Sequence, residues 1–127
     1  MPLSAERVAR LGALAALEKK ASDLVVLNLQ GISNVTDYFL ICSGHSTTQL
    51  TAIVEAIESC LDAEHRPPLH REGPPESGWM LLDYGDVVMH IFLKETRQHY
   101  ALEHLWGDAP ELALEPHRGV DFPTVPC

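Results

Sequence analysis

Basic residues, cysteines and long apolar runs are all scarce in this sequence, and each shortage excludes a class of protein. Nine Lys and Arg residues stand against 18 Asp and Glu residues, which gives a formal net charge of −9. A nucleic-acid backbone attracts clustered Lys and Arg, so we expect no direct binding to nucleic acid. The acidic balance favours a basic partner instead, and a basic protein is one candidate.

Cysteine spacing and hydropathy exclude two further classes. Cys42, Cys60 and Cys127 are widely separated and form no CxxC pair, so a zinc site is not expected. No apolar run approaches the roughly 20 residues that span a bilayer. The N-terminal segment carries charges inside its apolar pattern and lacks the layout of a signal peptide. We therefore expect a cytoplasmic protein with no metal and no cofactor.

The remaining composition is that of one globular domain with its own core. The chain has 127 residues, of which 46% are hydrophobic and 21% are charged. Apolar spacing predicts a first helix over about 5–20, with Ser4 as its N-cap. A capping box of Ser46 and Gln49 begins a second helix, and 95–106 predicts a third that ends before a glycine.

Five strands are predicted between these helices. Residues 23–31 form the first, and because its apolar residues fill both faces we expect a central position in the sheet. The others are predicted at about 38–42, at 69–72 and on both sides of a hairpin within 79–93. This order of elements predicts an α/β (α+β) fold, in which a single domain has a mixed sheet of about five strands flanked by helices.

The stretch WMLLDYGDVVMHIF, residues 79–92, has the pattern of a β-hairpin. Gly85 adopts a positive φ at little cost, so Tyr84 and Gly85 are the natural two-residue turn. Alternation then sorts the side chains onto two faces. One face is wholly apolar and is expected in the core: Met80, Leu82, Val87, Met89, Ile91 and Leu93.

The other face of the hairpin combines aromatic, aliphatic and acidic side chains. The same register places Asp83 opposite Asp86, and Trp79 opposite His90. Like charges directly across a hairpin destabilise it, so the two acids suit a docking surface that receives a cation of a partner. Two other interpretations stay open: the rings pack beneath a helix, or the acids and the histidine serve catalysis or metal binding. Catalysis is the weakest of the three, because a third metal ligand is missing.

Two smaller patterns have plain structural interpretations. Arg97, Tyr100, Glu103 and Trp106 recur every three residues on the last helix, which suits a packed helix or, as an alternative, a docking surface. The segment SGHS, at 43–46, precedes the second helix as a phosphate-binding loop would, but a capping turn is the simpler explanation.

Several segments of the sequence resemble the ribosomal silencing factor family, also called the Iojap-related family. They are DLVVLNLQGISNVTDYFLICSGHSTTQ, REG, WMLLDYGDVVMHIF and RQHYALEHLW. With the second helix they run from about Asp23 to Trp106, which is most of the chain. We therefore place the family domain at 1–107. The acidic, proline-containing segment 108–127 is expected to be loosely ordered.

This resemblance implies a fold similar to that of the nucleotidyltransferases, but no enzymatic activity. It implies binding to ribosomal protein fourteen of the large ribosomal subunit, on the face where the small subunit docks. Such binding blocks the joining of the subunits and represses translation when nutrients are scarce. Free members of the family often form homodimers, which is a further expectation here.

The expected site is a partner-binding surface, and no residue is expected to be catalytic. Its expected residues are Glu72, Trp79, Asp83, Tyr84, Asp86, His90, Arg97 and Tyr100. The alternative function is that of a metal-dependent nucleotidyltransferase-like enzyme acting on nucleotides. Such enzymes need a GS turn followed after about ten residues by a D-x-D strand that holds two metal ions. A helix follows SGHS here, so that metal site is not expected.

Overall fold

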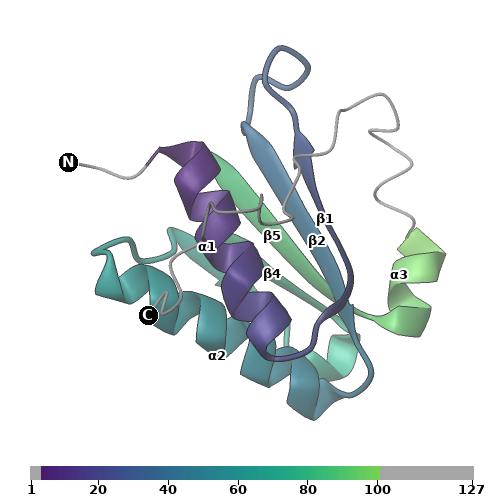
Figure 1. The fold of residues 1–127 in the computed structure, drawn as a ribbon. Helices are drawn as coiled ribbons and strands as arrows, with labels where there is room; N and C mark the ends of the chain where they lie inside the picture. Colours follow the sequence, from purple (N-terminus) through teal and green to yellow (C-terminus); the bar gives the residue numbers. More distant parts are fainter. Residues whose placement is uncertain (1–3, 101–127) are drawn as a thin grey trace, which may run out of the picture.

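The computed structural model describes the backbone of residues 4–100 and the side chains of residues 4–97. Its elements follow one another in the predicted order (Figure 1). They are α1 (Ala5–Glu18), β1 (Ser22–Asn28), β2 (Tyr38–Gly44), α2 (Thr47–Ala63), β3 (His70–Glu72), the 3-10 turn η1 (Pro75–Ser77), β4 (Trp79–Asp83), β5 (Val87–Leu93) and α3 (Lys94–Tyr100). Glu103, Trp106 and the segment 108–127 lie outside the described residues.

All five strands belong to one mixed sheet, in the order β1-β2-β5-β4-β3. Strands β2 and β5 run parallel, and the other neighbouring strands run antiparallel. The prediction of a five-stranded mixed sheet flanked by helices is confirmed. Within residues 4–100, no helix is long and apolar enough to cross a membrane.

The segment SGHS is a capping turn at the start of α2. The Ser46 hydroxyl accepts the Gln49 N–H at 3.1 Å, and the Gln49 side-chain oxygen accepts the His45 N–H at 2.7 Å. The Gln49 side-chain amide also donates to the carbonyls of Lys19 and Lys20, at 3.0 Å each. One side chain therefore caps α2 and ties it to the end of α1.

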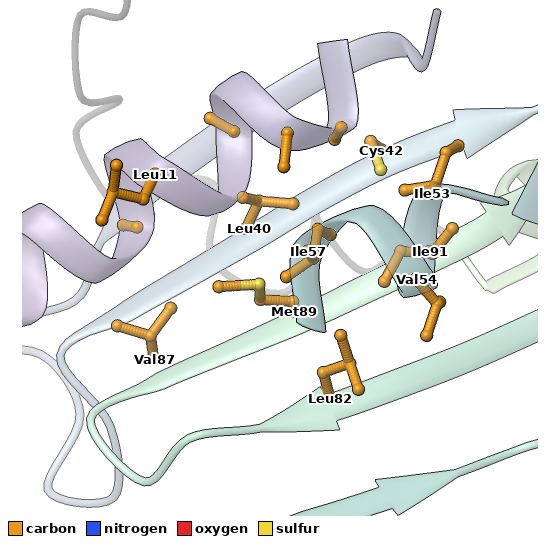
Figure 2. Close-up of a cluster of buried hydrophobic side chains, with 14 of the residues drawn as sticks. Leu11, Leu40, Cys42, Ile53, Val54, Ile57, Leu82, Val87, Met89 and Ile91 are labelled. Atoms are coloured by element: carbon orange, nitrogen blue, oxygen red, sulfur yellow. The ribbon is translucent and has the colours of Figure 1, made fainter. Parts of the chain in front are cut away.

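The main core lies between the sheet and the two long helices. Helices α1 and α2 lie side by side over one face of the sheet, which we call the first face (Figure 1). Figure 2 shows side chains that fill the space between these helices and the sheet, including Leu11, Leu40, Ile53, Val54, Ile57, Leu82, Val87, Met89 and Ile91. The predicted apolar face of the hairpin is confirmed, because five of its six residues are buried here and Leu93 packs against them.

Strand β1 lies at an edge of the sheet, so the prediction of a central position is wrong. Among the described strands it pairs with β2 alone. Leu24 and Val26 pack into the main core, whereas Val25 and Leu27 join a second apolar cluster on the opposite face. Packing on both faces makes an edge strand as apolar as a central one, and the sequence pattern cannot separate the two cases.

Candidate functional site

The turn of the β4–β5 hairpin lies one residue further along the chain than predicted. The Tyr84 N–H donates to the Val87 carbonyl at 2.9 Å, so Gly85 and Asp86 are the two turn residues. Gly85 has a φ of 90°, which suits the first central position of a type II′ turn. Tyr84 explains the shift, because its ring is only 2% exposed and continues the buried face of β4 after Leu82. Burial of this ring extends the pairing by one residue, and the predicted register is wrong.

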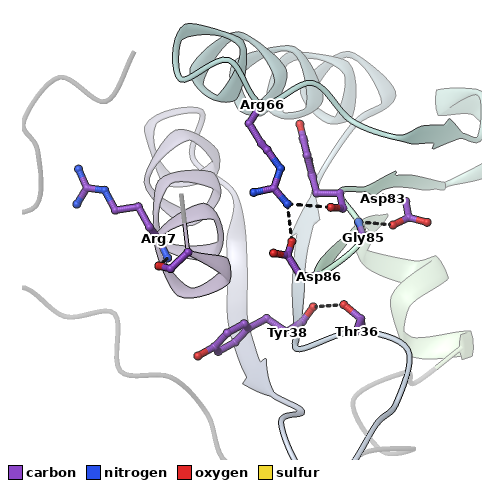
Figure 3. Close-up of polar contacts among 9 residues, drawn as sticks. Arg7, Thr36, Tyr38, Arg66, Asp83, Gly85 and Asp86 are labelled. Atoms are coloured by element: carbon purple, nitrogen blue, oxygen red, sulfur yellow. Dashed lines mark hydrogen bonds and ion pairs between the residues drawn. The ribbon is translucent and has the colours of Figure 1, made fainter. Parts of the chain in front are cut away.

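Asp83 and Asp86 therefore do not lie opposite each other. Asp83 pairs with Val88, and its Oδ1 accepts the Gly85 N–H at 2.8 Å (Figure 3). Asp86 Oδ1 forms an ion pair with Arg66 Nη2 at 2.7 Å. The predicted opposition of two acids is wrong, and each carboxylate has a partner within the chain.

The turn is also anchored to two other parts of the fold. The guanidinium of Arg66, in the loop after α2, donates to the Tyr84 carbonyl at 3.0 Å. The Asp86 carbonyl accepts the N–H groups of Asp37 and Tyr38, at 2.9 and 3.1 Å, where β2 begins. These contacts give Asp86 a structural role in joining the hairpin to β2 and to the α2 loop.

Trp79 and His90 touch each other, although they are not cross-strand partners. Trp79 lies opposite Phe92, and His90 lies opposite Leu81. The indole Nε1–H of Trp79 donates to His90 Nδ1 at 3.1 Å. Because Nδ1 accepts, the proton of neutral His90 is on Nε2. The predicted proximity of the two rings is present as a diagonal contact.

Four rings on the second face of the sheet form an aromatic cluster, namely Phe39, Trp79, His90 and Phe92. The His90 ring centroid lies 4.9 Å from that of Phe39 and 5.8 Å from that of Trp79, and Trp79 stacks on Phe92 at 5.3 Å. Phe39 and Trp79 are half-buried, whereas His90 and Phe92 are buried. Burial lowers the pKa of His90 to about 4, so the ring is neutral near neutral pH.

The strand registers extend this cluster into a larger patch with an acidic edge. Leu81 and Val88 lie half-buried beside the rings, and Asp83 follows on the same face. Glu72, on the edge strand β3, pairs with Leu81, and its exposed carboxylate lies 2.6 Å from His70 Nε2. We call the following set the second-face patch: Phe39, Glu72, Trp79, Leu81, Asp83, Val88, His90 and Phe92.

Besides Asp86, two other described residues of the predicted site lie away from this patch, Tyr84 and Arg97. Tyr84 is in the main core near α2, where burial raises the pKa of its hydroxyl. Arg97, on α3, donates to the Asp23 carbonyl and to the Ser43 hydroxyl, the latter at 2.9 Å. It therefore ties α3 to β1 and β2. The side chain of Tyr100 lies outside the described residues.

The sequence-based prediction missed two residues of this region, Phe39 and Arg66. Phe39 reaches the patch because β2 runs parallel to β5 and pairs it with Val88. Alternation along β2 indicates which side chains share a face, but no local pattern indicates which strand lies beside it. Arg66 lies in a loop, and no sequence signal pairs it with Asp86.

The patch has the chemistry of a contact surface. Large half-buried rings, aliphatic side chains and nearby carboxylates suit a protein partner with apolar and basic groups. Within residues 4–97, no group of three or more His, Cys, Asp or Glu side chains could hold a metal ion. Glu58, on α2 after the SGHS turn, forms an ion pair with Arg71 at 2.9 Å.

One family model and several named proteins match most of this sequence. A sequence model of the family described as "Ribosomal silencing factor during starvation" matches residues 2–124. "Ribosomal silencing factor RsfS" of Bacillus subtilis is 43% identical over 113 residues, which cover 89% of this chain and 96% of the relative.

Two crystal structures share the fold. A protein from Chromobacterium violaceum superposes with a TM-score of 0.79 at 26% identity, over 83% of this chain and 88% of that chain. A protein from Bacillus halodurans does so with a TM-score of 0.75 at 38% identity, over 86% and 99%. The protein is thus a small α/β domain of a known kind. It belongs to the ribosomal silencing factor family. The likeness to nucleotidyltransferases stays a prediction.

Proposed function

We propose that this protein binds the large ribosomal subunit and prevents the small subunit from joining it, which represses translation when nutrients are scarce. The observation that carries the proposal is the family match over 2–124, together with 43% identity to a named silencing factor. The proposed contact is ribosomal protein fourteen of the large subunit, at the intersubunit face. In this proposal the protein acts in the cytoplasm, without catalysis, and is a homodimer when free.

The second-face patch is the proposed contact surface. Trp79 and Phe39 present half-buried rings that both contact His90, and such rings dominate the binding energy of many interfaces. Glu72 and Asp83 supply carboxylates at its edge for basic side chains of the partner. The net charge of −9 opposes contact with ribosomal RNA, so the proposal assigns the main contact to a protein.

Co-sedimentation with isolated ribosomal subunits tests the proposal directly. The protein should pellet with large subunits and not with small subunits. Light scattering should then show fewer joined ribosomes when the protein is added to large subunits before small ones. Unchanged joining at saturating protein would contradict the proposal. Turnover of a nucleoside triphosphate with magnesium in the same preparation would support the enzyme alternative instead.

A further inference from the structure

The loop between β1 and β2 exposes two large aliphatic side chains. Ile32 is 47% exposed and Val35 is 86% exposed. Single exposed apolar residues are ordinary, but these two lie three positions apart on one loop that extends beyond the end of the sheet (Figure 1). Neither belongs to the second-face patch, so the loop needs a separate explanation.

Hydrogen bonds within the loop hold its backbone in place. The N–H groups of Ile32 and Ser33 both donate to the Leu29 carbonyl at 2.9 Å. The Ser33 hydroxyl then accepts the N–H groups of Val35 and Thr36, at 3.1 and 3.4 Å. A partner that covers the two aliphatic side chains does not have to order this loop, and a preorganised contact binds more tightly for the same area.

The loop joins the second face of the sheet at both of its ends. Leu29, at its start, is buried in one cluster with Leu27, Ile41 and Phe92. Phe39, the second residue of β2 after its end, packs against the same cluster. The apolar cluster beneath the second-face patch therefore continues to the start of the loop, and Phe39 of the patch follows close behind its end.

The charge of the loop indicates which kind of partner it can bind. Residues 29–36 contain no charged side chain, and Asp37 adds a half-buried carboxylate at the end. Without Lys or Arg the loop suits neither an RNA backbone nor an anionic membrane surface. An apolar recess rimmed by basic side chains, on a protein, complements the aliphatic pair, the Asp37 carboxylate and a chain with a formal net charge of −9.

We propose that this loop is a second docking contact, in which Ile32 and Val35 enter an apolar, basic-rimmed recess of the ribosomal protein that holds the second-face patch. This inference rests on the proposed function. The loop and the patch then contact one partner at two places. The loop increases the binding affinity without changing the fold.

The test compares loss of the exposed loop pair with loss of one exposed aliphatic side chain on another element. The double variant Ile32→Ser, Val35→Ser removes the exposed pair, and the control Leu17→Ser removes an aliphatic side chain on α1 that is also 47% exposed. Affinity for isolated large subunits is measured by co-sedimentation, and thermal unfolding checks the fold of each variant. In the complex the partner would bury both aliphatic side chains, so their loss should weaken the affinity of the double variant at least about tenfold. Leu17→Ser should bind as the unchanged protein does.

A third variant, Trp79→Ala, separates this inference from the proposed function. If Trp79→Ala weakens binding and the double loop variant does not, the loop contact is wrong and the function stands. If the unchanged protein does not bind large subunits, both are wrong. Sedimentation of the free protein covers one more outcome. If the double variant changes only the oligomeric state, the loop binds a second copy of this chain and the inference is overturned.

Discussion

Burial of His90 gives the folded protein a specific sensitivity to acid. The folded-state pKa of about 4 lies below the ordinary value of 6.5, so the unfolded chain takes up a proton first as the pH falls. The contribution of His90 to stability is therefore fully present above pH 6.5 and is lost between 6.5 and about 4. A difference of this size corresponds to at most roughly 3–4 kcal/mol.

We predict that His90→Gln loses less stability on acidification than the unchanged protein does. Gln does not titrate, and its amide oxygen can still accept the Trp79 N–H. Urea unfolding at about pH 7 and about pH 4.5 gives the loss of stability on acidification for each protein. The difference between the losses of the two proteins is the contribution of His90, because the carboxylates are the same in both. His45→Gln, at an exposed histidine, is the control. Equal losses in His90→Gln and the unchanged protein would show that His90 is not buried in the neutral form.

A second prediction concerns the ion pair at the hairpin turn. Asp86→Asn should lower the free energy of unfolding by about 1 kcal/mol, because it removes the charge opposite Arg66 at a partly buried site. Glu55→Gln makes the same chemical change at an exposed position of α2 and should leave stability unchanged. Denaturant unfolding measures both. Stability equal to or above that of the unchanged protein would mean that the turn is held by its backbone contacts alone.

At the scale of the element, Gln49 couples the two helices that cover the core. We predict that Gln49→Glu destabilises the protein more than Gln49→Ala does. Alanine loses the side-chain bonds at a cost of about 1–2 kcal/mol, whereas a carboxylate cannot donate to the carbonyls of Lys19 and Lys20 and repels them. Thr48→Ala, at the exposed neighbouring position, controls for the first turn of α2. Thermal unfolding ranks the variants, and a milder effect of Glu than of Ala would contradict the coupling.

Elements and caps are readable from the sequence because the interactions that form them are local. Ser46 and Gln49 lie three residues apart, and the buried stripe of α2 repeats with the helical period, so both follow from spacing. The edge position of β1 and the pairing of Phe39 with Val88 depend on which strands become neighbours. Those contacts join distant segments, and a single sequence carries no local sign of them.

The hairpin shows how one side chain changes a predicted register. A turn at Tyr84 and Gly85 has a favourable backbone conformation, but it would make Tyr84 a turn residue in place of a paired strand residue. In the structure the ring is buried, and the turn moves to Gly85 and Asp86. A turn that lies one residue further along moves each cross-strand partner by two residues. Every side chain therefore stays on its predicted face, although its partner changes. The two faces were therefore predictable, and the opposition of Asp83 and Asp86 was not.

Across the whole molecule, the main core lies on one face of the sheet and the proposed binding surface lies on the other. The first face holds α1 and α2 over the main core, and the second face carries the half-buried rings and the acidic edge. Changes on the partly exposed part of the second face should therefore weaken binding more than folding, whereas changes in the main core should do the reverse.

Trp79 tests this separation most directly. We predict that Trp79→Ala weakens binding to large subunits by more than about 1 kcal/mol, because a large half-buried indole on a contact surface is a typical hot spot. Trp79→Phe keeps a ring that can stack on Phe92 but loses the N–H that donates to His90, so its affinity should lie between the two. Co-sedimentation at several protein concentrations gives the affinities, and thermal unfolding shows whether each variant is folded at the assay temperature. Leu17→Ala, on α1, is the control for an exposed aliphatic residue on the other face. If Trp79→Ala is folded and binds as tightly as the unchanged protein, the indole packs the second face without contacting the partner, and the docking surface lies elsewhere.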